Sequence, residues 1–182
     1  VDYAFSDQTL LALGTTLYGK CRPEAMSQLF DDVLEVVGRP PGTADMAVFF
    51  SPRNAITPIH VDGSDSFTLQ LAGTKTWLLY SDERLPNPPV VNWTPPADPP
   101  LDLRWAFPDG LLVPTEPKLT VEMMPGAFLY VPPGMWHGTS AGEDGSISIN
   151  INLHDQTHSW TDVVLNSIKR CLLASAHLRD NP

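Results

Sequence analysis

The sequence is poor in cysteine, in basic residues and in long apolar runs, and each shortage excludes a class of protein. Its 182 residues include 2 cysteines, too few for a disulfide scaffold or a cysteine-based zinc cluster. We therefore expect reduced thiols at Cys21 and Cys171 and a cytoplasmic protein, with one disulfide between them as the alternative. No apolar run approaches the roughly 18 residues of a transmembrane helix, so we expect no membrane contact.

Basic residues are scarce relative to acidic ones. There are 11 lysines and arginines against 21 aspartates and glutamates, which gives a net charge of −10. This balance argues against a phosphate-binding surface, so we expect no nucleic-acid partner. A protein, a peptide or a small molecule remains as the substrate or partner. We expect no signal peptide in the first residues, because no basic start followed by an apolar stretch is visible there. The sequence begins at Val1, so we expect a fragment or a chain that lacks its first residues.

The apolar residues that are present predict one globular domain over residues 1–182. They make up 42% of the chain, which is enough for a core at this length. We expect residues 1–45 to be a helical part, because apolar side chains recur at helical spacing from Met26 to Val37 before Gly38 ends the pattern.

Residues 46–155 predict a β core. They hold short segments rich in β-branched and aromatic residues, separated by Gly, Pro, Asp or Asn. Many short strands with such turns favour a mainly β fold with flanking helices, either a barrel or a double-sheet jelly roll. Residues 156–182 predict a C-terminal helix with Ser159 as its N-cap. We expect the apolar face of this helix to dock on the barrel, with a homodimer through the helix as the alternative.

The segment 82–117 interrupts the β pattern and contains more than half of the chain's 19 prolines. Because proline lacks a backbone donor and ends regular elements, we expect neither helix nor strand in this insertion. Long loops of this kind are typically functional lids or ornaments. We expect a lid, packed down by Trp93, Trp105 and Phe107.

Two histidines and an aspartate form a candidate metal site. His60 and Asp62 lie at alternate positions of an expected strand, so both side chains point to one face. His137 opens another strand after a Pro-Pro-Gly turn. Two histidines and one carboxylate on one side of a metal leave the opposite positions open, which suits an Fe(II) ion that binds a cosubstrate and then O2.

Lys75 ends the segment "AGTK", which we expect to be a hairpin-like turn, and starts the returning strand. Two interpretations are open. Lys75 is either an edge lysine that faces water or an ammonium inside the barrel, where it needs an anionic partner. A dicarboxylic cosubstrate that chelates iron at one end would supply that anion at the other.

Polar residues alternate along "ININLH", at Asn150, Asn152 and His154. Because alternate residues of a strand share a face, these three side chains point either to water or to a polar cavity. We expect the cavity, since Ile147, Ile149, Ile151 and Leu153 then pack against the other layer.

Three motifs in the chain resemble those of the JmjC-type, cupin-like Fe(II)/2-oxoglutarate oxygenases. They are H-x-D in "ITPIHVDG", F-x-x-Q-x-x-G-x-K-x-W in "FTLQLAGTKTW", and P-G-x-x-x-Y-x-P-x-x-x-x-H in "PGAFLYVPPGMWH". The sequence is most similar to the ribosomal oxygenases and to the asparaginyl hydroxylase of the hypoxia pathway. The resemblance covers about residues 46–165, and "WTD" at Trp160 also resembles the ribosomal oxygenases.

The resemblance implies a double-stranded β-helix, which is a jelly roll, and assigns roles to individual residues. His60, Asp62 and His137 would hold Fe(II), and Lys75 would pair with the far carboxylate of 2-oxoglutarate. The further candidates for the cosubstrate pocket are Thr57, Asn152, Ser66 and Thr68.

Two positions depart from the patterns of this family. Phe49 stands where the ribosomal oxygenases carry a tyrosine, so one polar contact is absent. His154 stands where the hypoxia-pathway hydroxylase has a large aromatic residue near its substrate. We leave open whether His154 contacts substrate or is a hydrogen-bonded core histidine.

The motifs predict an Fe(II)- and 2-oxoglutarate-dependent dioxygenase. It would use O2 to hydroxylate a carbon of a protein side chain, peptide, amino acid or small molecule, with release of succinate and CO2. Two alternatives remain open at this point. One is a cupin-fold metal enzyme that does not use 2-oxoglutarate, and the other is a non-catalytic JmjC-like binding module.

Overall fold

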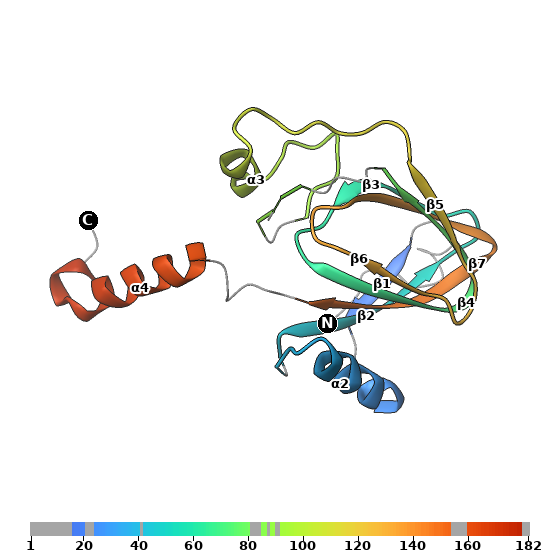
Figure 1. The fold of residues 1–182 in the computed structure, drawn as a ribbon, viewed down its shortest axis with the longest axis horizontal. Coiled ribbons are helices and arrows are strands. Elements are labelled where there is room, and N and C mark those ends of the chain that lie inside the picture. Colours follow the sequence, from blue (N-terminus) through green and yellow to red (C-terminus); the bar gives the residue numbers. More distant parts are fainter. Residues whose placement is uncertain are drawn as a thin grey trace, which may run out of the picture.

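The protein is a mainly antiparallel β structure with helices at its edges (Figure 1). The computed structural model describes residues 16–20, 24–40, 42–80, 85–86, 88–89, 92–153 and 160–179. The strands are β1 (Leu17–Lys20), β2 (Ala44–Ser51), β3 (Ile56–Val61), β4 (Asp65–Leu79), β5 (Leu119–Met123), β6 (Phe128–Val131) and β7 (Trp136–Leu153). The helices are η1 (Glu24–Met26), α2 (Ser27–Val36), α3 (Leu101–Ala106), α4 (Trp160–Ala174) and η2 (Ala176–Leu178). The predicted mainly β jelly roll with flanking helices is confirmed.

The two long strands, β4 and β7, pair with each other and contribute to both layers of the jelly roll. The first half of β4 pairs with the second half of β7, and the second half of β4 pairs with the first half of β7. One layer has the order β1–β2–β7–β4–β6, and the other has the order β3–β7–β4–β5. The layers face each other (Figure 1), so inward side chains of both lie between them.

Both long strands pass from one layer to the other at a corner, formed by residues 71–74 of β4 and 142–145 of β7. Gly73 has a φ of +63°, and a Cβ there would lie 2.0 Å from the carbonyl oxygen of Gly145. Only glycine lets the two backbones approach this closely. The segment "AGTK" therefore continues β4, and the predicted hairpin-like turn is wrong, because β7 remains the partner of β4 on both sides of the corner.

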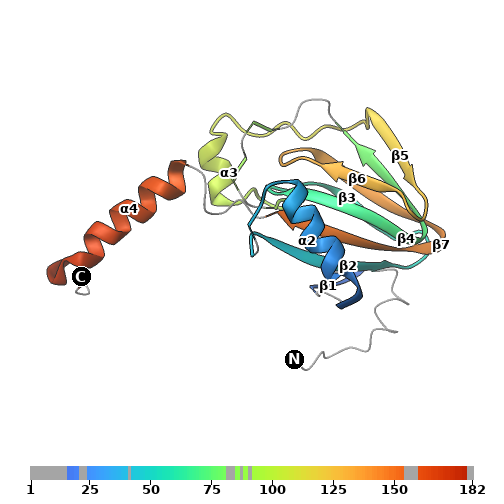
Figure 2. The same cartoon turned by 60° about the horizontal axis from the view of Figure 1, so that its bottom comes forward.

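Helix α2 confirms the helical pattern before Gly38 and covers the outer face of the first layer (Figure 2). Phe30 and Leu34 are 4% and 2% exposed. Gly38, with a φ of +69°, supplies the left-handed residue that ends the helix. The side chains beneath α2 come from β2 and β7 and are Met46, Ile149, Ile151 and Leu153.

Before α2, Glu24–Met26 forms the 3-10 helix η1, but the predicted helical structure is wrong for Leu17–Lys20. Leu17–Lys20 forms β1, which pairs antiparallel with residues 47–50 of β2. The β core also begins at Ala44, slightly before the predicted start. An edge strand offers unpaired backbone groups, and pairing with them is a tertiary interaction that helical spacing does not reveal. Residues 1–15 lie outside the described part.

The insertion 82–117 contains a short helix, α3, so the expectation of no regular element there is wrong. The helix begins directly after Pro100. A proline at the start of a helix removes no hydrogen bond, because the first N–H groups have no intrahelical partner. A high proline content therefore limits the length of a helix without excluding it.

The described part of the insertion packs on the barrel through one hydrophobic cluster. Leu103 of α3 is 1% exposed and lies in a cluster with Trp93 and Trp136, against which Phe107 packs. The expectation that Trp93 and Phe107 hold the insertion down is confirmed. Trp105 is 70% exposed, so the same expectation is wrong for that residue.

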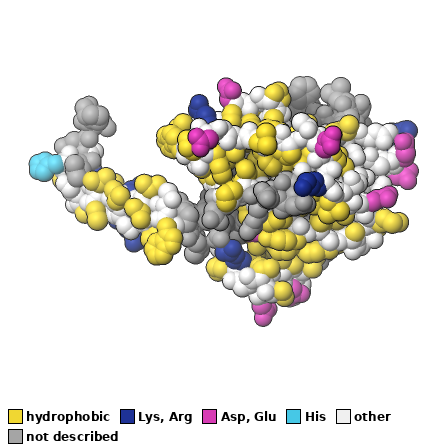
Figure 3. Space-filling view, turned by 45° about the horizontal axis from the view of Figure 1, so that its top comes forward, with side chains coloured by type: hydrophobic (Ala, Val, Ile, Leu, Met, Phe, Trp, Pro, Cys, Tyr) yellow, Lys and Arg dark blue, Asp and Glu magenta, His cyan; other side chains and the backbone are white. Residues whose placement is uncertain are grey.

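The C-terminal helix is confirmed as α4, but it lies away from the barrel (Figures 1 and 3). Val163, Ile168 and Leu172 are between 44% and 50% exposed, so the expected docking on the barrel is wrong. An amphipathic pattern predicts a buried face without saying which partner buries it. The homodimer through α4 stays a prediction, and the predicted cap Ser159 lies outside the described residues.

The structure also bears on two shortages noted in the sequence. Cys171 is a free, exposed thiol, whereas Cys21 lies outside the described residues. Within the described ranges, no helix is both long and apolar enough to cross a membrane.

Replacing Leu34 with alanine should lower the free energy of unfolding by about 2–5 kcal/mol, because the truncated side chain leaves a cavity beneath α2. Val36 lies on the same helix and is 85% exposed, so Val36→Ala should change this free energy by less than about 0.5 kcal/mol. Urea denaturation followed by circular dichroism measures both variants. Equal losses in the two would show that α2 does not pack on the barrel as described.

Candidate metal centre

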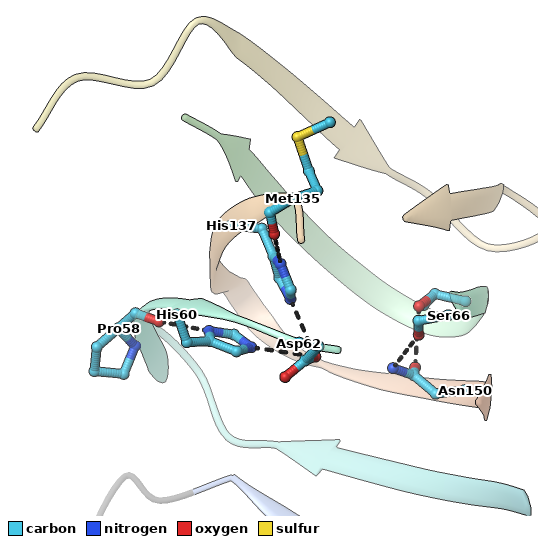
Figure 4. Close-up of polar contacts among 8 residues, drawn as sticks. Pro58, His60, Asp62, Ser66, Met135, His137 and Asn150 are labelled. Carbon is cyan, nitrogen blue, oxygen red and sulfur yellow. Dashed lines mark hydrogen bonds and ion pairs between the residues drawn. The ribbon is translucent and has the colours of Figure 1, made fainter. Parts of the chain in front are cut away.

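Three side chains with metal-binding atoms converge between β3 and β7. His60 and His137 are directly opposite each other in the β3–β7 pairing, and Asp62 follows β3. The ligand atoms of all three lie within 4.8 Å of one another. Asp62 Oδ2 is 3.8 Å from His60 Nε2 and 3.6 Å from His137 Nε2 (Figure 4). The structure thus brings together the three residues that the sequence predicted as one set.

Each of the two imidazoles is oriented by a backbone carbonyl on the side away from Asp62 (Figure 4). His60 Nδ1 lies 2.8 Å from the Pro58 oxygen, and His137 Nδ1 lies 2.9 Å from the Met135 oxygen. A carbonyl oxygen only accepts, so each Nδ1 donates its hydrogen and each Nε2 presents a lone pair. A hydrogen bond of this kind is usual for histidines that bind a metal.

The ring of His137 is neutral at physiological pH. Burial, with a smaller contribution from the nearby His60, lowers its pKa to about 4 against the opposing effects of Asp62 and the Met135 carbonyl. A neutral imidazole is the form that binds a metal. Trp77 stacks against the same ring, with centroids 5.4 Å apart and planes at 25°. This packing restricts the rotation of His137.

The Pro-rich insertion braces the backbone beside the ligands. Val61 and Trp93 exchange two backbone hydrogen bonds of 3.0 Å. The Gly134 N–H donates to the Asp62 carbonyl at 2.8 Å, and the Gly134 carbonyl accepts from the Leu85 N–H at 3.0 Å. A Cβ at Gly134 would lie 2.4 Å from the Leu85 oxygen, so the contact requires glycine. The expected lid is therefore anchored to the ligand-bearing segment where the structure describes it.

Lys75 lies inside the barrel and is 5% exposed, so the interpretation as a water-facing edge lysine is wrong. Its Nζ donates to Ser148 Oγ at 3.2 Å and lies 5.6 Å from the centre of the Phe49 ring, within the range of a cation–π contact. Among the described residues, no carboxylate forms an ion pair with Lys75. Burial lowers the pKa of Lys75 to about 8, because the ammonium has lost water without gaining an anion.

The predicted polar residues of β4 and β7 contact one another across the strands. Thr68 Oγ1 donates to Asn150 Oδ1 at 3.1 Å, and Asn150 Nδ2 donates to Ser66 Oγ at 3.5 Å. Asn152 Nδ2 donates to Asp45 Oδ1 at 3.3 Å. Ser66 and Thr68 are buried. These side chains therefore form a polar network on the inner face of the first layer.

The expected alternation of β7 is confirmed, since Asn150 and Asn152 lie on the face opposite Ile149 and Ile151. The expected packing of these isoleucines against the other layer is wrong, because they are buried under α2. Thr57 is half-buried and lies opposite Thr139, one bulge away from His60. His154 lies outside the described residues, so its two interpretations stay predictions.

Two buried residues to which the sequence analysis assigned no role carry unpaired polar atoms. Gln70 Oε1 and Trp77 Nε1 are buried and have no hydrogen-bond partner among the described residues. Gln70 lies opposite Ser148 in the β4–β7 pairing, and Trp77 packs on His137. Both are fixed positions of the motif F-x-x-Q-x-x-G-x-K-x-W, so the motif could have indicated them from the sequence. Simple alternation along that motif, however, places Gln70 and Trp77 on opposite faces of the strand.

Comparison with known proteins identifies the family. The model of the JmjC domain matches residues 20–162. The uncharacterised protein YxbC of Bacillus subtilis is 25% identical over 152 residues, which are 78% of this chain and 43% of that protein. Ribosomal oxygenase 2 of Mus musculus is 34% identical over 113 residues, which are 61% of this chain and 21% of that protein. The chain thus spans less than half the length of either relative.

Solved structures of YcfD, a ribosomal oxygenase of Escherichia coli, share the fold. One aligns over 92% of this chain and 40% of that chain with a TM-score of 0.58 at 19% identity. Another, in complex with cobalt and 2-oxoglutarate, aligns over 100% of this chain and 52% of that chain with a TM-score of 0.55 at 14% identity. The resemblance found in the motifs is confirmed: the chain belongs to the JmjC domain family.

Proposed function

We propose that the chain is the catalytic domain of an Fe(II)- and 2-oxoglutarate-dependent dioxygenase. The observation that carries the proposal is a buried ammonium, Lys75, in the same barrel as the converging ligand atoms of His60, Asp62 and His137. Within the described residues, no carboxylate pairs with this ammonium. Membership of the JmjC family supports the oxygenase class.

The three converging side chains fit a divalent iron ion. Two imidazole nitrogens and one carboxylate oxygen are the donor set of non-haem Fe(II) oxygenases, and three protein ligands leave coordination positions open. Ligand atoms at right angles around one ion, each about 2.1 Å from it, lie about 3 Å apart. The distances of 3.6 Å and 3.8 Å from Asp62 Oδ2 to the two Nε2 atoms need only a small contraction to reach that value. His60, Asp62 and His137 would hold the ion.

The barrel interior fits a small dicarboxylic acid. Lys75 offers an ammonium, and Trp77 Nε1 is a buried donor atom without a partner in the described chain. Such atoms are rare, because each costs about 1–3 kcal/mol when left unpaired. A 2-oxoglutarate that chelates the metal at its keto-acid end would present its other carboxylate to Lys75. The further contacts that we propose for this cosubstrate are Thr57, Asn152, Ser66 and Thr68.

The residues of the chain would bind, orient and exclude water. When bound, Fe(II) and 2-oxoglutarate supply the oxidation by O2, in which the keto acid is converted to succinate and CO2 and a substrate C–H becomes C–OH. The Nδ1 hydrogen bonds hold both imidazoles with Nε2 toward the metal position. Trp77 keeps His137 in place, and Lys75 neutralises the far carboxylate. The buried side of the site, at His137 and Lys75, would keep water from the cosubstrate.

The substrate is proposed by class. A carbon of a protein side chain, peptide, amino acid or small molecule would be hydroxylated, in a cytoplasmic protein. Ribosomal oxygenase 2 and YcfD are named ribosomal oxygenases, and for this chain we propose the oxygenase class without their substrate. The insertion is our candidate for the element that shapes substrate choice, because it is bonded to the backbone of Val61 and, through Gly134, of Asp62.

Replacing His137 or Asp62 with alanine should weaken metal binding by more than about 100-fold, since the outer partners of metal ligands alone are worth 10–100-fold. His177 is exposed in η2, so His177→Ala is the matched control and should bind metal like the wild type. Anaerobic calorimetry with Fe(II), or with Mn(II) as a stable substitute, measures the three affinities. Unchanged binding in His137→Ala would contradict the assigned metal site.

Replacing Lys75 with methionine should raise the Kd for 2-oxoglutarate about 10- to 100-fold, because a hydrogen bond to a charged group is worth about 1.5–3 kcal/mol. Metal affinity should not change, since Lys75 is no ligand. Lys169 lies exposed on α4, and Lys169→Met controls for the loss of one positive charge. Anaerobic titration of the iron-loaded protein with 2-oxoglutarate measures the Kd, and equal values in all three proteins would exclude the role of Lys75.

The affinity for 2-oxoglutarate should fall as the pH rises above about 8, the pKa to which burial lowers Lys75. Below that pH the side chain is charged and pairs with the carboxylate. Above it, binding must first take up a proton, which reduces the affinity by up to about tenfold per pH unit. The same titration between pH 7 and 9.5 tests this, and Lys75→Met should lack the decline.

The experiment that decides the proposal combines spectroscopy with product analysis. Iron-loaded protein and 2-oxoglutarate without O2 should give a weak metal-to-ligand charge-transfer band, absent in His137→Ala, and admission of O2 should release succinate. Metal binding without the band would point instead to a cupin-fold metal enzyme that does not use 2-oxoglutarate. Binding of neither metal nor 2-oxoglutarate would favour a non-catalytic binding module.

A further inference from the structure

The inward-facing side of β4 changes between its two halves. Ser66, Thr68 and Gln70 are buried at even-numbered positions, whereas Lys75 and Trp77 are buried at odd-numbered ones. Side chains of a regular strand alternate strictly, so continuing the first half would turn Lys75 outward. An irregularity between Gln70 and Lys75 must therefore reverse the alternation and bring the ammonium inside.

The irregularity is the extra residue at the corner. The register of β4 against β7 shifts between Gln70 and Ala72 and again between Gly73 and Lys75. Leu71 is 42% exposed and its neighbour Ala72 is exposed as well, so two consecutive side chains face water. An extra residue of this kind is a β-bulge, which redirects the side chains that follow it.

The side chain of Gln70 holds this bulge together. Its Nε2 donates to the carbonyl oxygens of Ala72 at 2.8 Å and Gly73 at 3.3 Å, and lies 2.9 Å from Ser146 Oγ across the corner. Both carbonyl groups belong to the two residues that directly follow the extra residue of β4. A primary amide has two N–H groups to donate, and a side chain without them cannot satisfy these buried acceptors.

The main chain of Gln70 is fixed as well. Its N–H donates to the Ala127 carbonyl at 3.0 Å, and its carbonyl accepts from the Gly126 N–H at 2.9 Å. Both partners lie between β5 and β6. The backbone of Gln70 is therefore held by the segment between β5 and β6, while its side-chain amide bonds to the bulge.

We propose that Gln70 is a positioning residue that acts through Lys75: its amide stabilises the bulge that turns the Lys75 side chain into the barrel. The effect on the proposed cosubstrate site is indirect, since it passes through the direction of β4 after the corner. Ser148 links the two residues, because it lies opposite Gln70 in the pairing and accepts the hydrogen bond of Lys75 Nζ. The inference rests on the proposed function for the identity of the ligand, 2-oxoglutarate. The bulge and the direction of the Lys75 side chain do not depend on that proposal.

A double-mutant cycle of Gln70→Met and Lys75→Met tests the inference. Methionine retains the length of glutamine and removes its N–H donors. Gln70→Met should weaken 2-oxoglutarate binding about tenfold, the equivalent of 1.4 kcal/mol, and should leave metal affinity unchanged. In the Lys75→Met background the same substitution should cause no further loss. A loss of equal size in both backgrounds would overturn the inference, because Gln70 would then act without Lys75.

A second measurement needs no ligand. The Cε resonance of Lys75 in protein labelled with 13C-lysine, assigned by its absence in Lys75→Met, reports the pKa of this amine. Gln70→Met should raise that pKa from about 8 in the wild type toward the value of about 10.4 for a lysine in water. An unchanged pKa would overturn the inference. If the wild type does not bind 2-oxoglutarate, the proposed function fails, whereas this comparison still tests the positioning role.

Two further variants separate positioning from a general loss of stability. Leu34→Ala weakens the core beneath α2, far along the chain from the corner, and should change neither the pKa of Lys75 nor the affinity for 2-oxoglutarate. Ser146→Ala removes one of the three acceptors of the Gln70 amide and should move both quantities in the direction of Gln70→Met by a smaller amount. If Gln70→Met does not fold, Ser146→Ala carries the test. Shifts in Leu34→Ala as large as those in Ser146→Ala would contradict the inference.

Discussion

The pairing of β4 with β7 is the interaction on which the rest of the structure depends. The ladder continues from one layer to the other through the corner, so both layers share the same two strands. In the second layer, β7 places His137 opposite His60 of β3. In the same layer, β4 carries Lys75 and the Trp77 ring that packs on His137. The candidate metal centre and the ammonium thus take their relative position from one continuous backbone pairing.

Folding already removes several polar side chains inside the barrel from water. Binding a ligand to them would not require that free-energy cost again. Burial depresses the pKa of Lys75, and Gln70 Oε1 and Trp77 Nε1 are unpaired within the described chain. Fixed polar groups in a buried site bind a matching ligand without further reorganisation. The barrel interior therefore holds polar groups that the described part of the chain leaves unsatisfied, at a cost in stability.

The insertion, helix α2 and helix α4 differ in how they contact the barrel. Helix α2 covers the outer face of the first layer with buried apolar side chains. The described part of the insertion adds backbone hydrogen bonds at Val61, which precedes Asp62, and at Gly134, whose N–H donates to the Asp62 carbonyl. Its packing therefore stabilises the ligand-bearing backbone directly. Helix α4 lies away from both and retains an exposed apolar face.

The sequence by itself determined the features that depend on residue type and short spacing. His60 and Asp62 alternate, His137 follows its turn, the helical repeat predicts α2, and the three motifs identify the family. Only the tertiary structure decided which segments become β1 and α3 and where α4 lies. The periodicity of a segment does not show which other segment pairs with it or packs on it. The direction of Lys75 is the sharpest case. Alternation from Gln70 turns it outward, and the bulge held at the corner between β4 and β7 turns it inward.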